Sequence, residues 1–417
     1  MRIIYLHQYF NTPDMEGSTR SYEMARRLVE RGHKVQMVTT FREREISRGR
    51  HWFQTVEGGI KVHWMPLAYS NIMSYRQRIG SFFKFAWKAS LKAASLEGDL
   101  IFATSTPLTI ALPAVYAARK KKVPLVFEVR DLWPELPVAV GALKNPATRM
   151  AAKRLELFAY NNSDYIVALS PGMKEGIVKT GYPADNVAVV PNGCDLELFS
   201  AGNEAGEKIR QDRHWLRDRP LVIYAGTIGI INGVDYLARV AGAVQELDPE
   251  ICFLVLGSGK GEGPLIAEAK KCGVLEKNLF VRPGVPKQAV PAWLAAADMA
   301  VSLFLDIKEM QANSANKFFD ALAAGKPVAI NYNGWQAHIL REAGAGIVLP
   351  PDDPVLSARM IAEKVRDRKW LEEAGSAARK LAEERFERGK LAGELEQVLL
   401  AAAGNRSNFG QGSVGNG

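Results

Sequence analysis

The sequence predicts an α/β protein with two doubly wound parallel sheets, each in its own domain. Short buried apolar runs alternate with helix-length segments along the chain, which is the pattern of strand-helix-strand units. The alternation restarts after a polar stretch at residues 201–220. A chain of 417 residues also exceeds what one hydrophobic core usually organises, and its hydrophobic share of 47% is that of a globular protein.

The first domain is expected to span residues 1–197. A helix over residues 21–30 should end at Gly32, because glycine readily adopts the left-handed conformation that follows a last helical turn. The apolar runs predict strands at Arg2–Gln8, His33–Thr40, Gly59–Met65, Leu100–Ala103, Leu125–Val129, Ser163–Ser170 and Val187–Val190.

The second domain is expected to span residues 198–375. Residues 376–403 favour helices that pack back toward the first domain, and the Gly, Asn and Ser of residues 404–417 predict a mobile tail. Ligands of such folds bind beyond the carboxyl ends of parallel strands, so we expect a cleft where these ends of the two sheets face each other. The strands are predicted at Leu221–Gly226, Cys252–Gly257, Leu279–Val281, Met299–Leu305, Val328–Ile330 and Ile347–Leu349.

The three cysteines, Cys194, Cys252 and Cys272, have neither paired nor CxxC spacing. A disulfide framework and a zinc site are therefore not indicated, and a reducing cytoplasm fits best. The first ten residues are too short an apolar run for a signal peptide. No run reaches the roughly 18 to 20 apolar residues of a membrane span.

The net charge of +9 is concentrated in the first half of the chain. Residues 1–197 hold 27 Lys and Arg against 18 Asp and Glu, whereas residues 198–417 hold 27 against 27. This asymmetry indicates that the first half faces an anionic partner, either nucleic acid or a membrane surface.

The segment 71–96 contains basic and aromatic residues and no acid. Spacing of four places three of its lysines on one helix face. A basic amphipathic helix with aromatic residues suits anionic lipid headgroups. The alternative is a domain helix with its aromatic residues in the core and its lysines in solvent. The candidate membrane-binding residues are Arg76, Arg78, Lys84, Lys88 and Lys92.

The segment 313–330 is the most informative part of the sequence. A polar turn leads into a helix that carries Lys317 and Asp320, Gly325 ends the helix, and a strand follows. Helix-start amides and an ammonium suit a diphosphate, and a carboxylate on the same helix face suits ribose hydroxyls. The alternative is a surface Lys–Asp pair on an amphipathic helix.

Five motifs in order resemble the GT-B glycosyltransferases, specifically the retaining family-4 group and its N-acetylfucosamine transferases of bacterial surface-polysaccharide assembly. The resemblance covers nearly the whole chain to about residue 400. The motifs are His7-Gln-Tyr-Phe10 with Glu16-Gly-Ser-Thr-Arg20, Glu128-Val-Arg-Asp-Leu-Trp-Pro-Glu135, Ser170-Pro-Gly-Met173, Val190-Pro-Asn-Gly193 and Lys317–Pro327.

The sequence departs from the family pattern at two places. An acidic residue usually lies eight positions before the ribose carboxylate, but here that position is Ala312. The usual Arg and Lys after the first strand of the second domain are absent from residues 224–235. Diphosphate binding is then assigned to Lys317, the amides around Asn316, Thr227 and Arg282.

Glycine-bearing turns after strands supply the other candidate donor contacts. By resemblance, Gly257, Ser258 and Arg282 hold the base. Gly226 in the second domain, with Gly17 and Ser18 in the first, lets backbone amides approach a phosphate or the acceptor. The alternatives are tight strand-to-helix turns and a loop that caps a helix.

The segment Glu128-Val-Arg-Asp131 supplies the candidate catalytic residues. Many relatives have a histidine followed by Asp-Leu, but this chain has Arg130 before Asp131, so no histidine role is transferred. Asp131 or Glu128 is the candidate for orienting the acceptor hydroxyl or donor sugar. A buried salt bridge that holds the loop is the alternative.

The resemblance implies transfer of an N-acetylated hexosamine or deoxyhexosamine, with retention, from a nucleotide-sugar, most often a UDP-sugar. The acceptor is a polyprenyl-diphosphate-linked sugar in O-antigen or capsule synthesis. The leaving diphosphate assists removal of the acceptor proton, so no metal or further cofactor is expected. We expect a cytoplasmic protein that is peripheral on the inner face of the bacterial inner membrane and binds no nucleic acid. A GT-B-type nucleotide-sugar epimerase and a basic nucleic-acid-binding protein are the alternatives.

Overall fold

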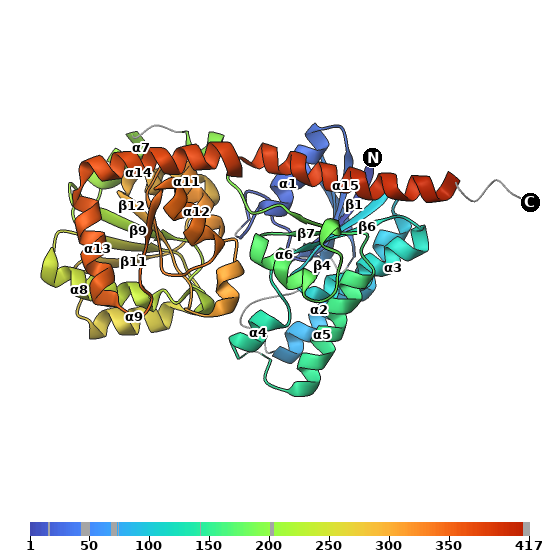
Figure 1. Ribbon diagram of the computed structural model, residues 1–417, viewed down its shortest axis with the longest axis horizontal. Coiled ribbons are helices and arrows are strands. Elements are labelled where there is room, and N and C mark those ends of the chain that lie inside the picture. The colour runs from blue at the N-terminus through green and yellow to red at the C-terminus, as the bar shows by residue number, and fades with distance from the viewer. Residues whose placement is uncertain are drawn as a thin grey trace, which may run out of the picture. The chain divides into compact units, whose positions relative to one another are not determined.

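The computed structural model describes residues 1–15, 17–42, 51–67, 73, 75–141, 143–200 and 204–411, with the backbone alone at 75, 76 and 405–411. Glu16 of the first motif therefore lies outside the described residues. The chain forms two compact units, Met1–Pro191 with Gly389–Gly417, and Asn192–Arg388. Each unit holds one sheet with helices packed on it (Figure 1).

Unit 1 contains a sheet of eight strands among its described residues, in the order β3-β4-β2-β1-β5-β6-β7-β8. All pairs are parallel except β3 with β4. The strands are β1 Arg2–Leu6, β2 Lys34–Phe41, β3 Phe53–Glu57, β4 Ile60–Pro66, β5 Leu100–Thr104, β6 Leu125–Val129, β7 Tyr165–Ala168 and β8 Val187–Val189. The helices are α1 Arg20–Glu30, α2 Tyr75–Ser95, α3 Ala111–Lys121, α4 Glu135–Ala139, α5 Pro146–Asn161, α6 Pro171–Val178 and α15 Arg388–Gln411.

Helices α1 and α15 share the core on one face of the unit 1 sheet. Strand residues such as Tyr5 and Phe102 pack there with Leu28 of α1 and Leu395 of α15. Glu396 also ties α15 to this unit, because its carboxylate accepts from His33 at 2.7 Å. Helix α15 continues to Gln411, into the segment for which the composition predicts a mobile tail.

Unit 2 contains a parallel sheet of six strands among its described residues, in the order β11-β10-β9-β12-β13-β14. The strands are β9 Leu221–Ala225, β10 Cys252–Leu256, β11 Leu279–Arg282, β12 Met299–Ser302, β13 Val328–Ile330 and β14 Gly346–Val348. The helices are α7 Glu204–Gln211, α8 Asp235–Leu247, α9 Glu262–Lys271, α10 Val290–Ala296, α11 Asn316–Ala323, α12 Trp335–Ala343, α13 Pro354–Arg366 and α14 Arg368–Leu381, followed by a π-helical turn at Ala382–Phe386.

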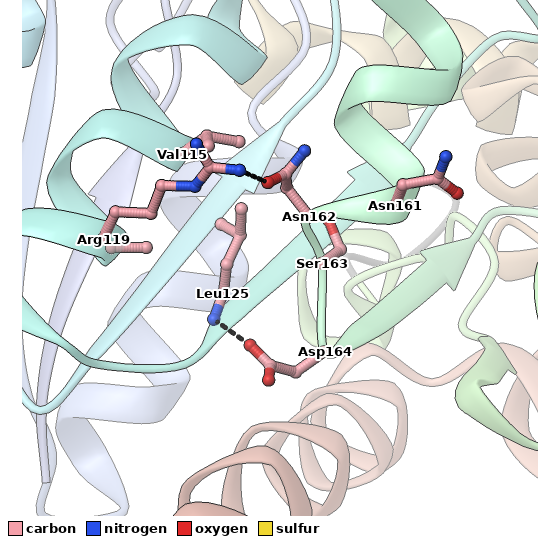
Figure 2. A pocket seen from close by; sticks show the side chains of 8 residues that line it. Val115, Arg119, Leu125, Asn161, Asn162, Ser163 and Asp164 are labelled. Carbon is pink, nitrogen blue, oxygen red and sulfur yellow. Dashed lines mark hydrogen bonds between the residues drawn. The ribbon is translucent and has the colours of Figure 1, made fainter.

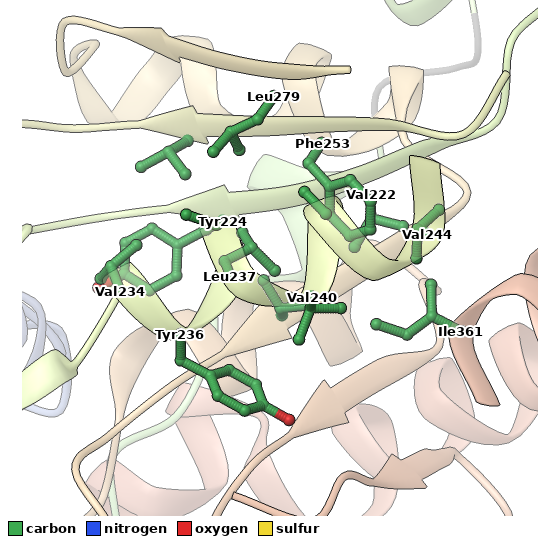
Figure 3. Close-up of a cluster of buried hydrophobic side chains, with 14 of the residues drawn as sticks. Val222, Tyr224, Val234, Tyr236, Leu237, Val240, Val244, Phe253, Leu279 and Ile361 are labelled. Atoms are coloured by element: carbon green, nitrogen blue, oxygen red, sulfur yellow. The ribbon is translucent and has the colours of Figure 1, made fainter. Parts of the chain in front are cut away.

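The core of unit 2 lies between its sheet and helices α8, α9 and α13 (Figure 3). Val222 and Phe253 project from neighbouring strands onto Leu237 and Val240 of α8. Tyr236 places its hydroxyl 2.6 Å from the Ser357 hydroxyl, which satisfies a polar group inside an otherwise apolar cluster. This rigid layer fixes where the strands end.

The predicted fold class is confirmed, and most strands match their predicted positions within a few residues. Strand β3 was not predicted. It is the antiparallel edge strand, and its residues alternate between exposed and half-buried, so it lacks the apolar run that marks the central strands.

The order of strands reverses beside β1 in unit 1 and beside β9 in unit 2. Strand β1 lies between β2 and β5, and β9 lies between β10 and β12. Ligands of doubly wound folds bind at such a switch point, beyond the carboxyl ends of the strands. The loops that follow these strands are therefore the expected ligand-binding segments.

Candidate functional site

Two loops of unit 2 lie side by side beyond β9 and β10. The Gly226 amide donates to the Leu256 carbonyl at 2.9 Å, and the Ile228 amide donates to the Ser258 carbonyl at 2.9 Å. A Cβ atom at Gly257 would lie 1.9 Å from the Gly226 carbonyl oxygen. Glycine at 257 is thus required for the two loops to approach, and together they form one surface on which Thr227 and Ser258 are exposed.

Lys317 lies beside this surface, at the second residue of α11. A Cβ atom at Gly226 would lie 3.2 Å from Lys317 Cε. The Lys317 ammonium is 5.0 Å from the centre of the Tyr224 ring and 5.1 Å from that of Phe304. Burial lowers the pKa of Lys317 to about 8, and nearby Asp320 opposes the shift. Within the described residues no carboxylate forms an ion pair with Lys317.

Asp320 lies one turn further along α11 and is paired with a different lysine. Lys287 Nζ is 2.5 Å from Asp320 Oδ2. The Lys317–Asp320 surface pair, which the sequence left open as an alternative, is therefore not formed. The helix instead presents an unpaired ammonium and a paired carboxylate, three residues apart, on one face.

The start of α11 is held by the segment that follows β8. The Asn192 amide donates to Ser314 Oγ at 3.1 Å, and the Asn192 side chain donates to the Ser314 carbonyl at 2.5 Å. Asn316 is the first residue of the helix, so the amide of Lys317 belongs to its first turn. Asn192 thus holds the residues that precede the helix start, which the sequence assigns to the diphosphate.

Arg282, which the sequence assigns to the diphosphate and the base, is paired with an acid in the structure. Its guanidinium makes two hydrogen bonds to Glu276, at 2.7 and 2.9 Å, and this pairing raises the pKa of Arg282. Its carbonyl accepts from the Gly257 amide at 3.0 Å. The backbone at residue 282 thus supports the Gly257 loop, while the Arg282 side chain is paired with Glu276.

A second polar cluster lies beyond β1, β5 and β6 in unit 1. Arg130 donates to Ser18 Oγ at 3.2 Å and approaches His7 Nε2 at 3.5 Å. Asp131 accepts from the Thr106 hydroxyl at 3.2 Å. Burial raises the pKa of Asp131, while the Arg130 charge opposes the shift. Arg130 thus lies against Ser18 and His7, and Asp131 lies against Thr106.

Glu128 is used differently from its neighbours. Its Oε1 accepts from Arg20 at 2.9 and 3.1 Å, and its Oε2 accepts from the Thr104 hydroxyl at 2.5 Å. Both side chains of the ion pair are buried, with exposed fractions of 0% and 1%. The same guanidinium donates to the carbonyls of Val190 and Pro191. The geometry favours the buried salt bridge that the sequence left open, so we remove Glu128 from the candidate catalytic residues.

Gly17 opens the loop that carries Ser18. Its φ of +122° lies in the region that favours glycine, and Asn11 donates from its side chain to the Ser18 carbonyl at 3.2 Å. The loop is therefore fixed by its own contacts, and its Ser18 hydroxyl reaches the Arg130 guanidinium.

Helix α2 presents both apolar and basic residues to solvent. Phe83, Trp87 and Leu91, spaced by four, are 55%, 70% and 51% exposed, and Lys84 and Lys88 are exposed beside them. Phe85 is instead buried in the unit, so only part of the aromatic set belongs to the core.

The other basic residues of this helix contribute less to that surface. Lys92 is half-buried over the Trp52 ring, and burial followed by the Lys61 charge lowers its pKa. Arg78 is half-buried, and the side chain of Arg76 lies outside the described residues. The exposed stripe consists of Phe83, Lys84, Trp87, Lys88 and Leu91.

A cavity of about 230 Å³ lies at the opposite edge of the unit 1 sheet (Figure 2). It lies where β6 begins and before β7, away from the carboxyl ends. Arg119 donates to the Asn162 side chain, and the Leu125 amide donates to Asp164 at 2.8 Å. These polar groups bond to one another, so this cavity is not part of the site.

In the part of the chain that the structure describes, no three His, Cys, Asp or Glu side chains gather as metal ligands would. No described helix is long and apolar enough to cross a membrane.

No role was predicted from the sequence for Lys287, His7 or Thr106. Each follows a strand at its carboxyl end, and this position is the signal that could have identified them. Their partners lie 33, 123 and 25 residues away in the sequence, so spacing alone does not reveal the pairings.

Comparisons with known proteins agree with this arrangement. Residues 17–193 match the "Glycosyl transferase 4-like domain" and residues 206–381 match "Glycosyl transferases group 1". D-inositol 3-phosphate glycosyltransferase of Xylanimonas cellulosilytica is 26% identical over 60% of this chain and 60% of its own length. A putative colanic acid biosynthesis glycosyl transferase, WcaI of Escherichia coli, is 22% identical over 69% of this chain and 73% of its own.

Among solved structures, HepE of Anabaena in complex with UDP-glucose is similar, with a TM-score of 0.73 at 17% identity, over 96% of this chain and 100% of that one. This likeness supports the fold. The chain spans 60% of the length of the inositol-phosphate enzyme, less than two thirds.

Proposed function

Taking as the premise that this chain is a family-4-like glycosyltransferase of the GT-B fold, we propose that it transfers a sugar from a nucleotide-sugar to a polyprenyl-diphosphate-linked acceptor. The donor is a UDP-sugar whose sugar is an N-acetylated hexosamine or deoxyhexosamine. Transfer occurs with retention at the inner face of the bacterial inner membrane, in surface-polysaccharide synthesis.

The observation that carries this proposal is the unpaired ammonium of Lys317. An amine with aromatic neighbours and no carboxylate partner is poorly stabilised in the free protein, as the lowered pKa shows. A diphosphate placed against Lys317 and the first amides of α11 supplies the missing charge. Charge that develops on the leaving diphosphate is stabilised by the same groups.

On the acceptor side, we assign the reacting hydroxyl to Asp131 and Arg130. The raised pKa of Asp131 reflects burial, and its hydrogen bond from Thr106 fixes the carboxylate. Asp131 can accept a hydrogen bond from a hydroxyl, while Arg130 and Ser18 face an anionic group. These roles require no metal ion.

The exposed stripe of α2 is assigned to the membrane. Its apolar side chains are exposed to solvent on one face of the helix, and two exposed lysines lie beside them. Aromatic residues insert at the lipid headgroup level, and lysines attract anionic lipids. The name of the colanic acid relative supports a role in surface-polysaccharide assembly.

Mass spectrometry tests the reaction. UDP- and GDP-sugars are incubated with polyprenyl-diphosphate-linked sugars or with inositol phosphate. We expect the lipid-linked acceptor to gain one sugar residue, with release of UDP and with the anomeric configuration of the donor retained by NMR. Isomerisation of the donor without transfer would identify an epimerase, and transfer to inositol phosphate alone would contradict the proposed acceptor.

Sedimentation with phosphatidylglycerol vesicles tests the membrane surface. Lys84→Glu with Lys88→Glu should lower the vesicle partition coefficient about thirtyfold or more, because each lysine near the surface contributes about 1 kcal/mol. The charge-matched control changes the exposed Lys208 and Lys270 to Glu and should bind as the wild type does. Equal loss of vesicle binding in both variants would show that net charge alone explains the effect. Binding to neutral vesicles or to DNA as strong as binding to phosphatidylglycerol vesicles would contradict the assignment.

A further inference from the structure

Lys287 touches the carboxylate that the sequence assigns to ribose. It begins the 3₁₀ turn Lys287–Ala289 that follows β11, and it reaches Asp320 on α11. The Lys287 side chain is 24% exposed and the Asp320 side chain is 13% exposed, so the ion pair is partly buried but can still be reached from solvent. The Lys287 ammonium also lies 5.3 Å from the centre of the Phe199 ring.

The hydrogen-bonding capacity of this pair is only partly used. An ammonium has three donors and a carboxylate has two acceptor oxygens. One contact joins Lys287 Nζ to Asp320 Oδ2, and within the described residues neither side chain has another hydrogen bond or ion pair. Donors on Lys287 and the Oδ1 atom of Asp320 are therefore available to a ligand.

A vicinal diol fits this combination. Each hydroxyl can donate to a carboxylate oxygen, and each hydroxyl oxygen can accept from an ammonium. Building on the proposed function, we infer that Lys287 and Asp320 together bind the 2′,3′-diol of the donor ribose. Lys287 is thus both a direct contact and the residue that holds Asp320 in position.

The location of the pair agrees with this role. Asp320 is three residues after Lys317 on the same helix face, so a diphosphate at Lys317 places the attached ribose toward Asp320. Lys287 also brings a second ammonium to a site that lacks the Arg and Lys usual after the first strand.

Calorimetric titration with UDP and with 2′,3′-dideoxy-UDP tests the inference, with GDP and its dideoxy analogue used if GDP binds more tightly. Lys287→Met should weaken binding of the ribonucleotide about tenfold and that of the dideoxy analogue less than twofold, because only the former carries the diol. Lys287→Arg should keep affinity within about threefold. Added to Asp320→Asn, Lys287→Met should cost much less than it does alone, since the two residues act as one unit.

The matched control is Lys270→Met, which removes an exposed lysine from α9 and should change neither affinity. Equal weakening of both ligands by Lys287→Met would show a phosphate contact or a structural role and would overturn the inference, as would unchanged UDP affinity. If Asp320→Asn discriminates against the dideoxy analogue as the wild type does, or if the wild type binds no nucleoside diphosphate, the proposed function itself fails.

Discussion

Arg20 in unit 1 and Lys317 in unit 2 are two cations beneath the carboxyl edge of a sheet, with opposite surroundings. Arg20 donates to Glu128 and to two backbone carbonyls, and both charged groups are buried. Lys317 has aromatic faces beside it and no carboxylate partner among the described residues. A buried ion pair with every bond made serves the fold, whereas a desolvated cation without a partner marks a place for an anion.

Glu128 and Asp131 also differ in how completely their carboxylates are paired. Both oxygens of Glu128 are occupied, and the charges of Arg20 and Arg130, with hydrogen bonds from Arg20 and Thr104, hold its pKa low against the effect of burial. Among the described residues Asp131 accepts one side-chain hydrogen bond, from Thr106, and burial raises its pKa. Residues that were neighbours in one motif therefore take different roles according to how completely they are paired.

The largest effect is expected from Arg20→Met. Removing the guanidinium leaves Glu128 as an uncompensated buried charge, so we expect the free energy of unfolding to fall by about 3 to 5 kcal/mol. Urea denaturation measures this change. UDP affinity of the folded fraction should stay within about twofold. A loss of UDP affinity without a loss of stability would assign Arg20 to the donor and break the comparison.

Lys317→Met should weaken UDP binding about 100-fold, or about 2.7 kcal/mol, because in our assignment the diphosphate loses the ammonium that contacts it. Calorimetric titration at pH 7 measures the affinity. Unfolding should need no less urea than in the wild type, since the variant removes a desolvated charge. Affinity within about threefold of the wild type would remove Lys317 from the donor site.

Asp131→Asn should lower turnover about tenfold to thirtyfold and leave donor affinity nearly unchanged, because the hydroxyl loses a charged hydrogen-bond acceptor. Steady-state kinetics with the lipid-linked acceptor give kcat and the donor KM. Glu128→Gln serves as the contrast, with its main effect on stability. Near-normal turnover in Asp131→Asn would place Asp131 with Glu128 among the structural residues.

The elements of the fold follow well from the sequence because central parallel strands are buried on both faces and read as apolar runs. Strand β6 begins and ends as predicted, at Leu125 and Val129. Strand β3 was missed because an edge strand buries one face only. The length of α15 was also missed, since its last residues resemble a linker in composition.

The candidate site was predicted in part. The positions of Lys317 and Asp320 on one helix face follow from their spacing, whereas the contact of Arg130 with Ser18 was not predicted. The partners of Asp320, Arg282 and Glu128 did not follow. The partners of Asp320 and Glu128 lie on other elements, so their identity depends on how the elements pack, whereas Glu276 lies in the turn six residues before Arg282.

Proton uptake on UDP binding tests the central claim most directly. The pKa of Lys317 is about 8 in the folded protein against an ordinary 10.5, so the unfolded chain binds more protons between these values and the wild type gains stability as pH rises from about 8. A diphosphate, already fully ionised there, should raise this pKa again.

Titration at pH 8.5 in two buffers of different ionisation enthalpy gives the number of protons exchanged. We predict net uptake of a fraction of a proton, a fall in UDP affinity as pH rises above 8, and loss of both effects in Lys317→Met. Absence of proton uptake in the wild type, or the same uptake in Lys317→Met, would contradict the claim that Lys317 meets the donor diphosphate.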